Sequence, residues 1–244
     1  MRLKSLGLLP VLFSAAVPLS AATIFTDPTF TLGNYSQVIY NSDTADVTVT
    51  VQETASGNPG TAMEVLNTWS TPNITFTTIT GLINTTFLYN PSTQGPIQSI
   101  DFSVDRYITL VGGTLGGTNN GTVLLLQNGK YYFDQITGPA LVAGTFQTIP
   151  AAGLLASDFQ LLDFTTGIVD GTQHPDFSAS GGLIDFGTRV SFGHINMVNS
   201  GGTLDVRLDN LTISLTTTPE PGAYGLVAAG LAGLWFLRRR RAQS

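Results

Sequence analysis

Residues 204–215 read Leu-Asp-Val-Arg-Leu-Asp-Asn-Leu-Thr-Ile-Ser-Leu, and this stretch decides the fold. Apolar and polar side chains largely alternate along it, so a β-strand places the apolar ones on one face and the polar ones on the other. The period predicts a chain built mainly of half-buried β-strands. Similar runs recur at residues 46–51, 73–80, 100–104 and 107–111.

Turn-forming residues separate these runs. Asn128-Gly129 lies between strand-like residues 122–127 and 130–134 and predicts a type I′ hairpin, because both central residues of that turn need positive φ. Residues 151–159 offer the one helical turn. Short strands with frequent turns favour a single all-β domain over residues 23–217, a two-sheet antiparallel β-sandwich of the jelly-roll type.

Composition excludes several classes of function. The chain has 244 residues, with 10 Lys+Arg, 16 Asp+Glu and no cysteine. The basic residues gather at the two ends, so the middle is strongly acidic and does not suit nucleic acid, whose phosphates need Lys and Arg. Without cysteine there is no disulfide scaffold, thiol nucleophile or cysteine-ligated metal site.

The first 22 residues have the three-part order of a secretory signal peptide. Arg2 and Lys4 form a basic start, residues 6–17 are mostly apolar, and small residues lead up to Ala22. This order predicts export, with a signal peptidase cutting between Ala22 and Thr23.

Residues 218–244 form a second targeting segment. Pro219-Glu220-Pro221 precedes an uncharged, mostly apolar stretch at residues 223–237, which approaches the length of a short transmembrane helix. Arg238, Arg239, Arg240 and Arg241 follow and would hold the end in the cytoplasm. Both ends therefore place the body outside the membrane.

The Pro-Glu-Pro triplet, apolar helix and arginine cluster together resemble the PEP-CTERM sorting signal. The resemblance implies that an exosortase, a membrane-embedded protease, recognises the tail and cuts it near Pro219-Glu220-Pro221. It also implies a Gram-negative producer of exopolysaccharide or biofilm. The protein would be anchored in the inner membrane until cleavage and would then reach the cell surface or the extracellular matrix.

Parts of the body resemble jelly-roll domains of the concanavalin-like or carbohydrate-binding-module kind. The resemblance rests on Gly57-Asn58-Pro59-Gly60, on residues 153–159 and on residues 208–213. It implies sugar binding and leaves a structural calcium ion open; no other cofactor is expected. Sugars pack on aromatic faces, which makes Trp69, Tyr131 and Tyr132 candidate glycan contacts. Adjacent tyrosines on a strand point to opposite faces, so one of the pair is expected in the core.

The sequence offers no catalytic motif. His174-Pro175-Asp176 is the one cluster of histidine and acid, and it lacks a packed nucleophile. Asp101 with Asp105, and Asp205 with Asp209, share strand faces at even spacing and are expected to be solvated, although paired acids also suit glycoside hydrolysis or calcium.

We therefore expect a secreted, exosortase-processed, non-catalytic surface or matrix protein associated with exopolysaccharide. A lectin-like carbohydrate-binding module is the alternative, and a glycan hydrolase or lyase is the third hypothesis. The lectin hypothesis requires an exposed Trp69 or tyrosine beside converging polar groups in a groove.

Overall fold

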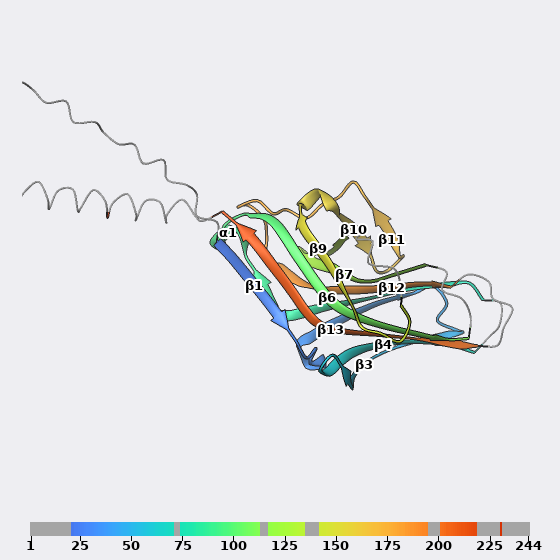
Figure 1. Cartoon of the computed structure of the whole chain (residues 1–244). Coiled ribbons are helices and arrows are strands. Elements are labelled where there is room, and N and C mark those ends of the chain that lie inside the picture. The colour runs from blue at the N-terminus through green and yellow to red at the C-terminus, as the bar shows by residue number, and fades with distance from the viewer. Residues whose placement is uncertain are drawn as a thin grey trace, which may run out of the picture.

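Two antiparallel β-sheets pack face to face in the computed structural model (Figure 1), which describes residues 21–70, 74–112, 117–134, 142–194, 201–218 and 230. The expected all-β, two-sheet antiparallel sandwich is confirmed. The first sheet, sheet A, has the order β3-β4-β13-β6-β9, with β1 also paired to β13. Its strands are β1 (Ala21–Asp27), β3 (Val47–Gly57), β4 (Gly60–Trp69), β6 (Ile97–Val111), β9 (Gln147–Leu154) and β13 (Gly202–Thr217).

The second sheet, sheet B, has the order β11-β10-β8-β7-β12-β5-β2. Its strands are β2 (Tyr35–Asn41), β5 (Phe76–Tyr89), β7 (Gly117–Gln127), β8 (Lys130–Asp134), β10 (Phe159–Asp163), β11 (Ile168–Asp170) and β12 (Ile184–His194). Three short helical turns join strands of the two sheets: η1 (Leu32–Asn34), α1 (Pro91–Gln94) and η2 (Ala156–Asp158).

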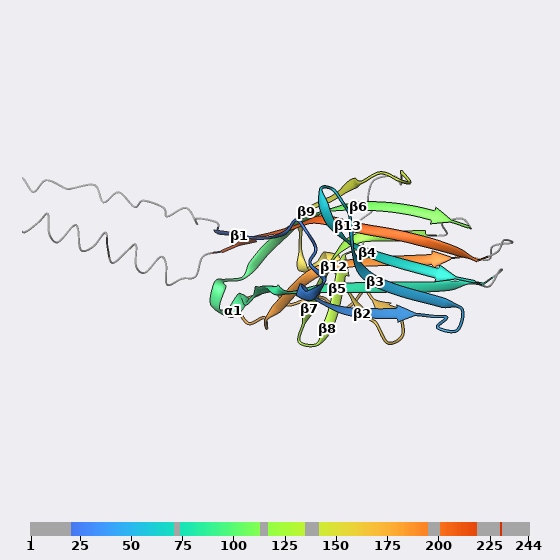
Figure 2. The same cartoon turned by 90° about the horizontal axis from the view of Figure 1, so that it is seen from below.

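Strand β13, which contains the alternating stretch 204–215, is central to sheet A. Leu204, Val206 and Leu208 point inward and are fully buried, as the alternation predicts. One edge of β13 pairs with β6 along most of its length. The other edge is shared by β4, opposite residues 202–208, and β1, opposite residues 211–217 (Figure 2).

Strand β6 is longer than its sequence suggests. Residues 100–104 and 107–111 read as two strands, yet β6 runs unbroken through Arg106. The Arg106 side chain lies on the buried face, 4% exposed, and donates from Nη2 to Gln147 Oε1 at 3.2 Å. Burial lowers the pKa of Arg106. A partner distant in sequence therefore keeps a charged residue inside the strand.

Two local predictions can be compared directly with the backbone. Asn128 and Gly129 have φ of 53° and 75°, which confirms the type I′ hairpin between β7 and β8. The helical turn expected in residues 151–159 is the single 3-10 turn η2, whereas most of the rest of that stretch is strand.

A second apolar cluster lies on the outer face of sheet B. It contains Ile79, Ile83, Leu124, Phe133, Leu162 and Phe164. Phe164 follows β10 and folds back over the sheet, where Gly81 of β5 leaves room for its ring. The outer face of sheet B is thus largely filled by side chains of the chain itself.

The expected signal peptide lies outside the described residues except for Ala21 and Ala22. The expected transmembrane helix, except for Gly230, also lies outside them, as do the Pro-Glu-Pro triplet and the arginine cluster. Within the described part of the chain, no helix has the length and apolar character needed to cross a membrane.

Replacing Gly81 with alanine tests the packing on sheet B. A Cβ atom at this position would lie 2.7 Å from Phe164 Cζ and 2.8 Å from Leu124 Cδ2. We expect Gly81→Ala to lower the free energy of unfolding of residues 23–218 by about 1–3 kcal/mol, as overpacking does. Gly33→Ala is the control, because nothing lies within 4 Å of a Cβ there. Equal urea midpoints for the two variants would contradict this packing.

Candidate functional site

The outer face of sheet A carries polar side chains in register across neighbouring strands. Thr48 of β3, Thr68 of β4 and Thr203 of β13 lie directly opposite one another. Val111 of β6 extends the same row beside Thr203. Their sequence neighbours Val47, Trp69 and Leu204 point into the core. The pairing of β3, β4 and β13 therefore lines up three hydroxyl groups that are far apart in sequence.

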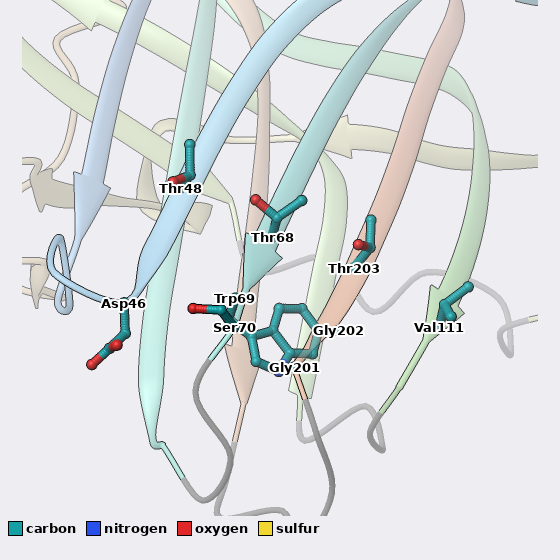
Figure 3. A pocket seen from close by; sticks show the side chains of 9 residues that line it. All are labelled: Asp46, Thr48, Thr68, Trp69, Ser70, Val111, Gly201, Gly202 and Thr203. Carbon is teal, nitrogen blue, oxygen red and sulfur yellow. The ribbon is translucent and has the colours of Figure 1, made fainter.

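This row borders a hollow of about 430 Å³ at one end of the sheet (Figure 3). The described residues that line it are Asp46, Thr48, Thr68, Trp69, Ser70, Val111, Gly201, Gly202 and Thr203. Each hydroxyl group offers one donor and two acceptor positions. Such a lining matches a ligand rich in hydroxyl groups, and Trp69 with Val111 supplies an apolar surface beside it.

Trp69 forms the inner wall of the hollow. Its side chain is 6% exposed and packs against Phe76 and Phe192, with ring centroids 5.4 Å and 5.9 Å away. A Cβ atom on residue 202 would overlap the Trp69 ring, so glycine is required there. Trp69 is therefore a core residue whose edge borders the hollow, and it is not the exposed tryptophan that the lectin hypothesis requires.

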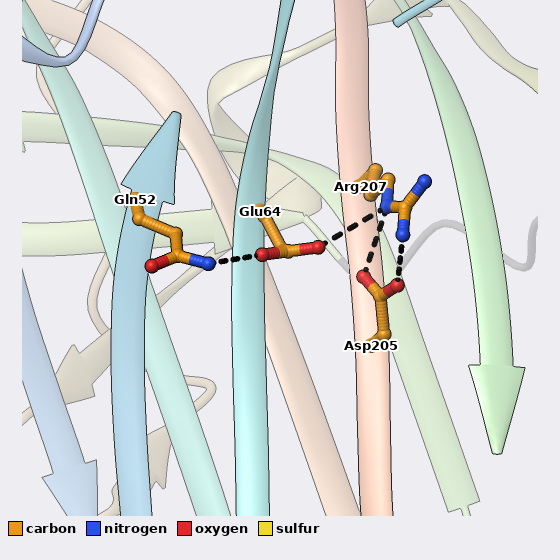
Figure 4. A network of polar contacts seen from close by, with 4 residues as sticks. All are labelled: Gln52, Glu64, Asp205 and Arg207. Carbon is orange, nitrogen blue, oxygen red and sulfur yellow. Dashed lines mark hydrogen bonds and ion pairs between the residues drawn. The ribbon is translucent and has the colours of Figure 1, made fainter. Parts of the chain in front are cut away.

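A network of four polar side chains lies further along the same face (Figure 4). Arg207 donates from Nε to Glu64 Oε1 at 3.2 Å and from Nη2 to Asp205 Oδ2 at 2.6 Å. Gln52 donates to the other Glu64 oxygen at 2.5 Å. Two carboxylates, one on β4 and one on β13, thus share the guanidinium group of Arg207.

Burial and charge set the protonation of this network. Burial raises the pKa of the Asp205 carboxyl; Arg207 opposes the rise and the nearby Glu64 adds to it. Asp205 is 9% exposed. Asp209, on the same strand, is fully buried and accepts from the backbone N–H groups of Asn58 and Asn210. The expectation that these two aspartates are solvated is therefore wrong, because neighbouring donors enclose both.

An aromatic pair that the sequence analysis missed lies beside the network. Tyr107 of β6 and Phe146 are both partly exposed, with ring centroids 5.4 Å apart, and the Arg207 guanidinium lies 4.9 Å from the Tyr107 ring. The even spacing of Tyr107 from Asp101 and Asp105 on the polar face was the available signal. Phe146 lies just before β9, and its sequence context gave no signal that it would lie on this face.

The adjacent tyrosines point to opposite faces, as expected. Tyr132 is 6% exposed in the core between the sheets. Tyr131 lies on the outer face of sheet B, edge-on to Phe164 at 4.9 Å, and lines a hollow of about 380 Å³ with Lys130, Asp163 and Thr165. Tyr131 thus meets part of the lectin requirement, since it is a half-exposed tyrosine beside polar groups.

The remaining polar candidates have partners within the body. His174 Nδ1 lies 2.6 Å from the Phe159 carbonyl oxygen, and the Asp176 carboxylate accepts from the Ser178 backbone N–H at 2.9 Å. Asp101 accepts from the Gly153 N–H at 2.7 Å, and Asp105 accepts from the Thr148 hydroxyl at 2.5 Å. Among the described residues there is no group of three or more His, Asp or Glu that could hold a metal ion.

Comparison with known families identifies a sorting motif near the C-terminal end of the sequence. Residues 217–241 match the model of the PEP-CTERM protein-sorting motif. The chain carries a PEP-CTERM sorting motif. This motif implies export and exosortase processing, with a C-terminal membrane anchor before cleavage and a surface or extracellular destination after it.

The body is similar to solved carbohydrate-binding modules at low scores. The C-terminal family 22 carbohydrate-binding module of Clostridium thermocellum Xyn10B has 11% identity and a TM-score of 0.32, over 77% of this chain and 95% of that one. TmCBM61, solved with β-1,4-galactotriose, has 11% identity and a TM-score of 0.27, over 76% and 93%. No curated protein matches the chain significantly.

Removing Arg207 tests the polar network. In Arg207→Met two neighbouring carboxylates lose their shared cation, and we expect a loss of roughly 1–3 kcal/mol in the free energy of unfolding at pH 7. One carboxyl then has a folded-state pKa raised above its unfolded value, so folding favours its protonated form. The deficit relative to wild type should therefore shrink as the pH falls from 7 to 5. Arg207→Lys, which keeps the charge, is the control, and a deficit independent of pH would contradict the assignment.

Proposed function

We propose that the chain is an exported, exosortase-processed surface or matrix protein whose jelly-roll-type sandwich binds exopolysaccharide without catalysing a reaction. One observation carries the proposal: β13 has the hydroxyl-lined hollow at its first residues, and the sorting motif begins at its last residue, Thr217. A strand of this length separates the two by roughly 45 Å. An anchored tail would therefore hold the hollow away from the membrane.

The chemistry of the hollow supports binding rather than hydrolysis. Its described lining includes one carboxylate, that of Asp46, whereas glycoside hydrolysis uses two carboxyl groups on either side of the bond. The two carboxylates of the network further along the face are both engaged by Arg207. The strongly acidic body would also resist unspecific self-association.

Sorting takes place in four steps under this proposal. A signal peptidase removes residues 1–22 by cutting between Ala22 and Thr23. The apolar segment then anchors the chain in the inner membrane of a Gram-negative cell, and Arg238, Arg239, Arg240 and Arg241 keep its end in the cytoplasm. The exosortase cuts near Pro219, Glu220 and Pro221, and the body joins the exopolysaccharide or biofilm matrix.

The hydroxyl row can be tested by binding of the mature protein to the producer's own exopolysaccharide. Thr68→Val with Thr203→Val removes two hydroxyl groups but keeps the branched side chains. At about 0.5–1.5 kcal/mol for each lost hydrogen bond, we expect the Kd to rise about tenfold. Thr212→Val, on the same strand and face near its other end, is the control. Binding by wild type that survives in the double variant would place the glycan elsewhere, for example near Tyr131. No binding by wild type would favour a structural matrix role.

The sorting signal can be tested in the producing cell. Replacing Arg238–Arg241 with serine, or Pro219 and Pro221 with alanine, should leave chains with an uncut tail, because retention or recognition is lost. The intact mass of the recovered protein measures this directly. Tail removal at the wild-type rate in both variants would contradict exosortase processing through this signal.

A further inference from the structure

The sorting motif begins without a linker where the folded sheet ends. Strand β13 reaches Thr217, and the motif starts at that residue. Thr217 is paired with Ala21 of β1 on one side and with Ile97 of β6 on the other. The next residue, Thr218, still donates its N–H to the Pro96 carbonyl oxygen at 3.2 Å. The chain just before the Pro-Glu-Pro triplet is therefore part of the sheet.

The two halves of strand β1 differ in how firmly they are packed against the rest of the body. Its second half is anchored to sheet B: Phe25 stacks on Phe87 with ring centroids 5.2 Å apart, and Asp27 accepts from the Tyr35 hydroxyl at 3.0 Å. Its first half lies at the surface, where Ile24 is 61% exposed. Residues 21–24, in this exposed half, are the ones that pair with residues 214–217 (Figure 1).

A protease needs an extended, unpaired stretch of backbone, and cleavage of a folded chain follows the population of its opened form. Residues 214–217 are paired with β1 on one side and with β6 on the other, so release of β1 frees one edge of this stretch. We propose that β1 acts as a clamp on the sorting signal. Residues 21–24 must first separate from residues 214–217, and only then does the exosortase cut the tail. This inference rests on the exosortase processing in the proposed function.

The clamp connects the two processing steps. The expected signal peptidase cut between Ala22 and Thr23 removes Ala21 and Ala22 from β1. These residues form the pairs with Thr217 and Thr216, which are the pairs nearest to the sorting motif. Leader removal therefore loosens the part of β13 that the exosortase must reach, and tail cleavage follows leader cleavage.

A disulfide can lock the clamp in the full-length chain in the producing cell. Ile24 and Ser214 are directly paired on the outward face, where antiparallel partners lie within disulfide reach. The chain has no cysteine of its own, and the exported body meets an oxidising compartment. In pulse–chase labelling, we expect Ile24→Cys with Ser214→Cys to slow tail removal at least about tenfold, which corresponds to about 1.4 kcal/mol. Added reductant should restore the rate.

Three comparisons keep this test decisive. The single variants Ile24→Cys and Ser214→Cys control for the substitutions, and Thr50→Cys with Leu66→Cys places a disulfide across a paired position between β3 and β4. Ile24→Gly, which weakens the exposed half of β1, should speed tail removal up to about fivefold. If wild type is cut and the locked chain is cut equally fast, the clamp is wrong. If wild type itself keeps its tail, the exosortase processing in the proposed function is wrong.

Discussion

The pairing of β13 with three other strands is the constraint on which the rest of the structure depends. Its inward leucine and valine side chains hold the sheets together, and its outward residues build the polar face. The register with β4 aligns Thr203 with Thr68, and the register with β1 places Ala21 beside Thr217. A shift by one residue would exchange the two faces, turning Asp205 and Arg207 toward the apolar core and Leu204 and Val206 toward the outer face. The core, the hollow and the exit of the tail thus share one register.

The sequence predicts those parts of the fold that local chemistry determines. Period-two alternation located β13, and Asn128-Gly129 located a hairpin, because each signal lies within a few neighbouring residues. Arg106 interrupted the same reasoning in β6, since its partner Gln147 is distant in the chain. The aspartates at 205 and 209 were misjudged although part of their environment is local: Arg207 and Asn210 donate from the same strand, and Asn58 donates to Asp209 from the turn before β4.

The candidate site was predicted only in part. Trp69 and Tyr131 were chosen as aromatic residues, and each lines a hollow, but the threonine row could not be recognised. Thr48, Thr68 and Thr203 are unremarkable in sequence and gain meaning from a register that joins three strands. The sorting signal is the opposite case, because its parts are contiguous in the chain. The sorting signal could be predicted from the sequence, whereas the row of hydroxyl groups can be recognised only from the pairing of the strands in the sheet.

The most direct test of the account is hydrogen–deuterium exchange of the mature protein with and without the producer's exopolysaccharide. Binding at the hollow predicts slower amide exchange in residues 68–70 and 201–203, with no change at the opposite end of β13, in residues 211–217. Slowing confined to sheet B around Tyr131, or to the end of β13 near the tail, would contradict the central claim that this protein holds glycan at the pole farthest from its anchor.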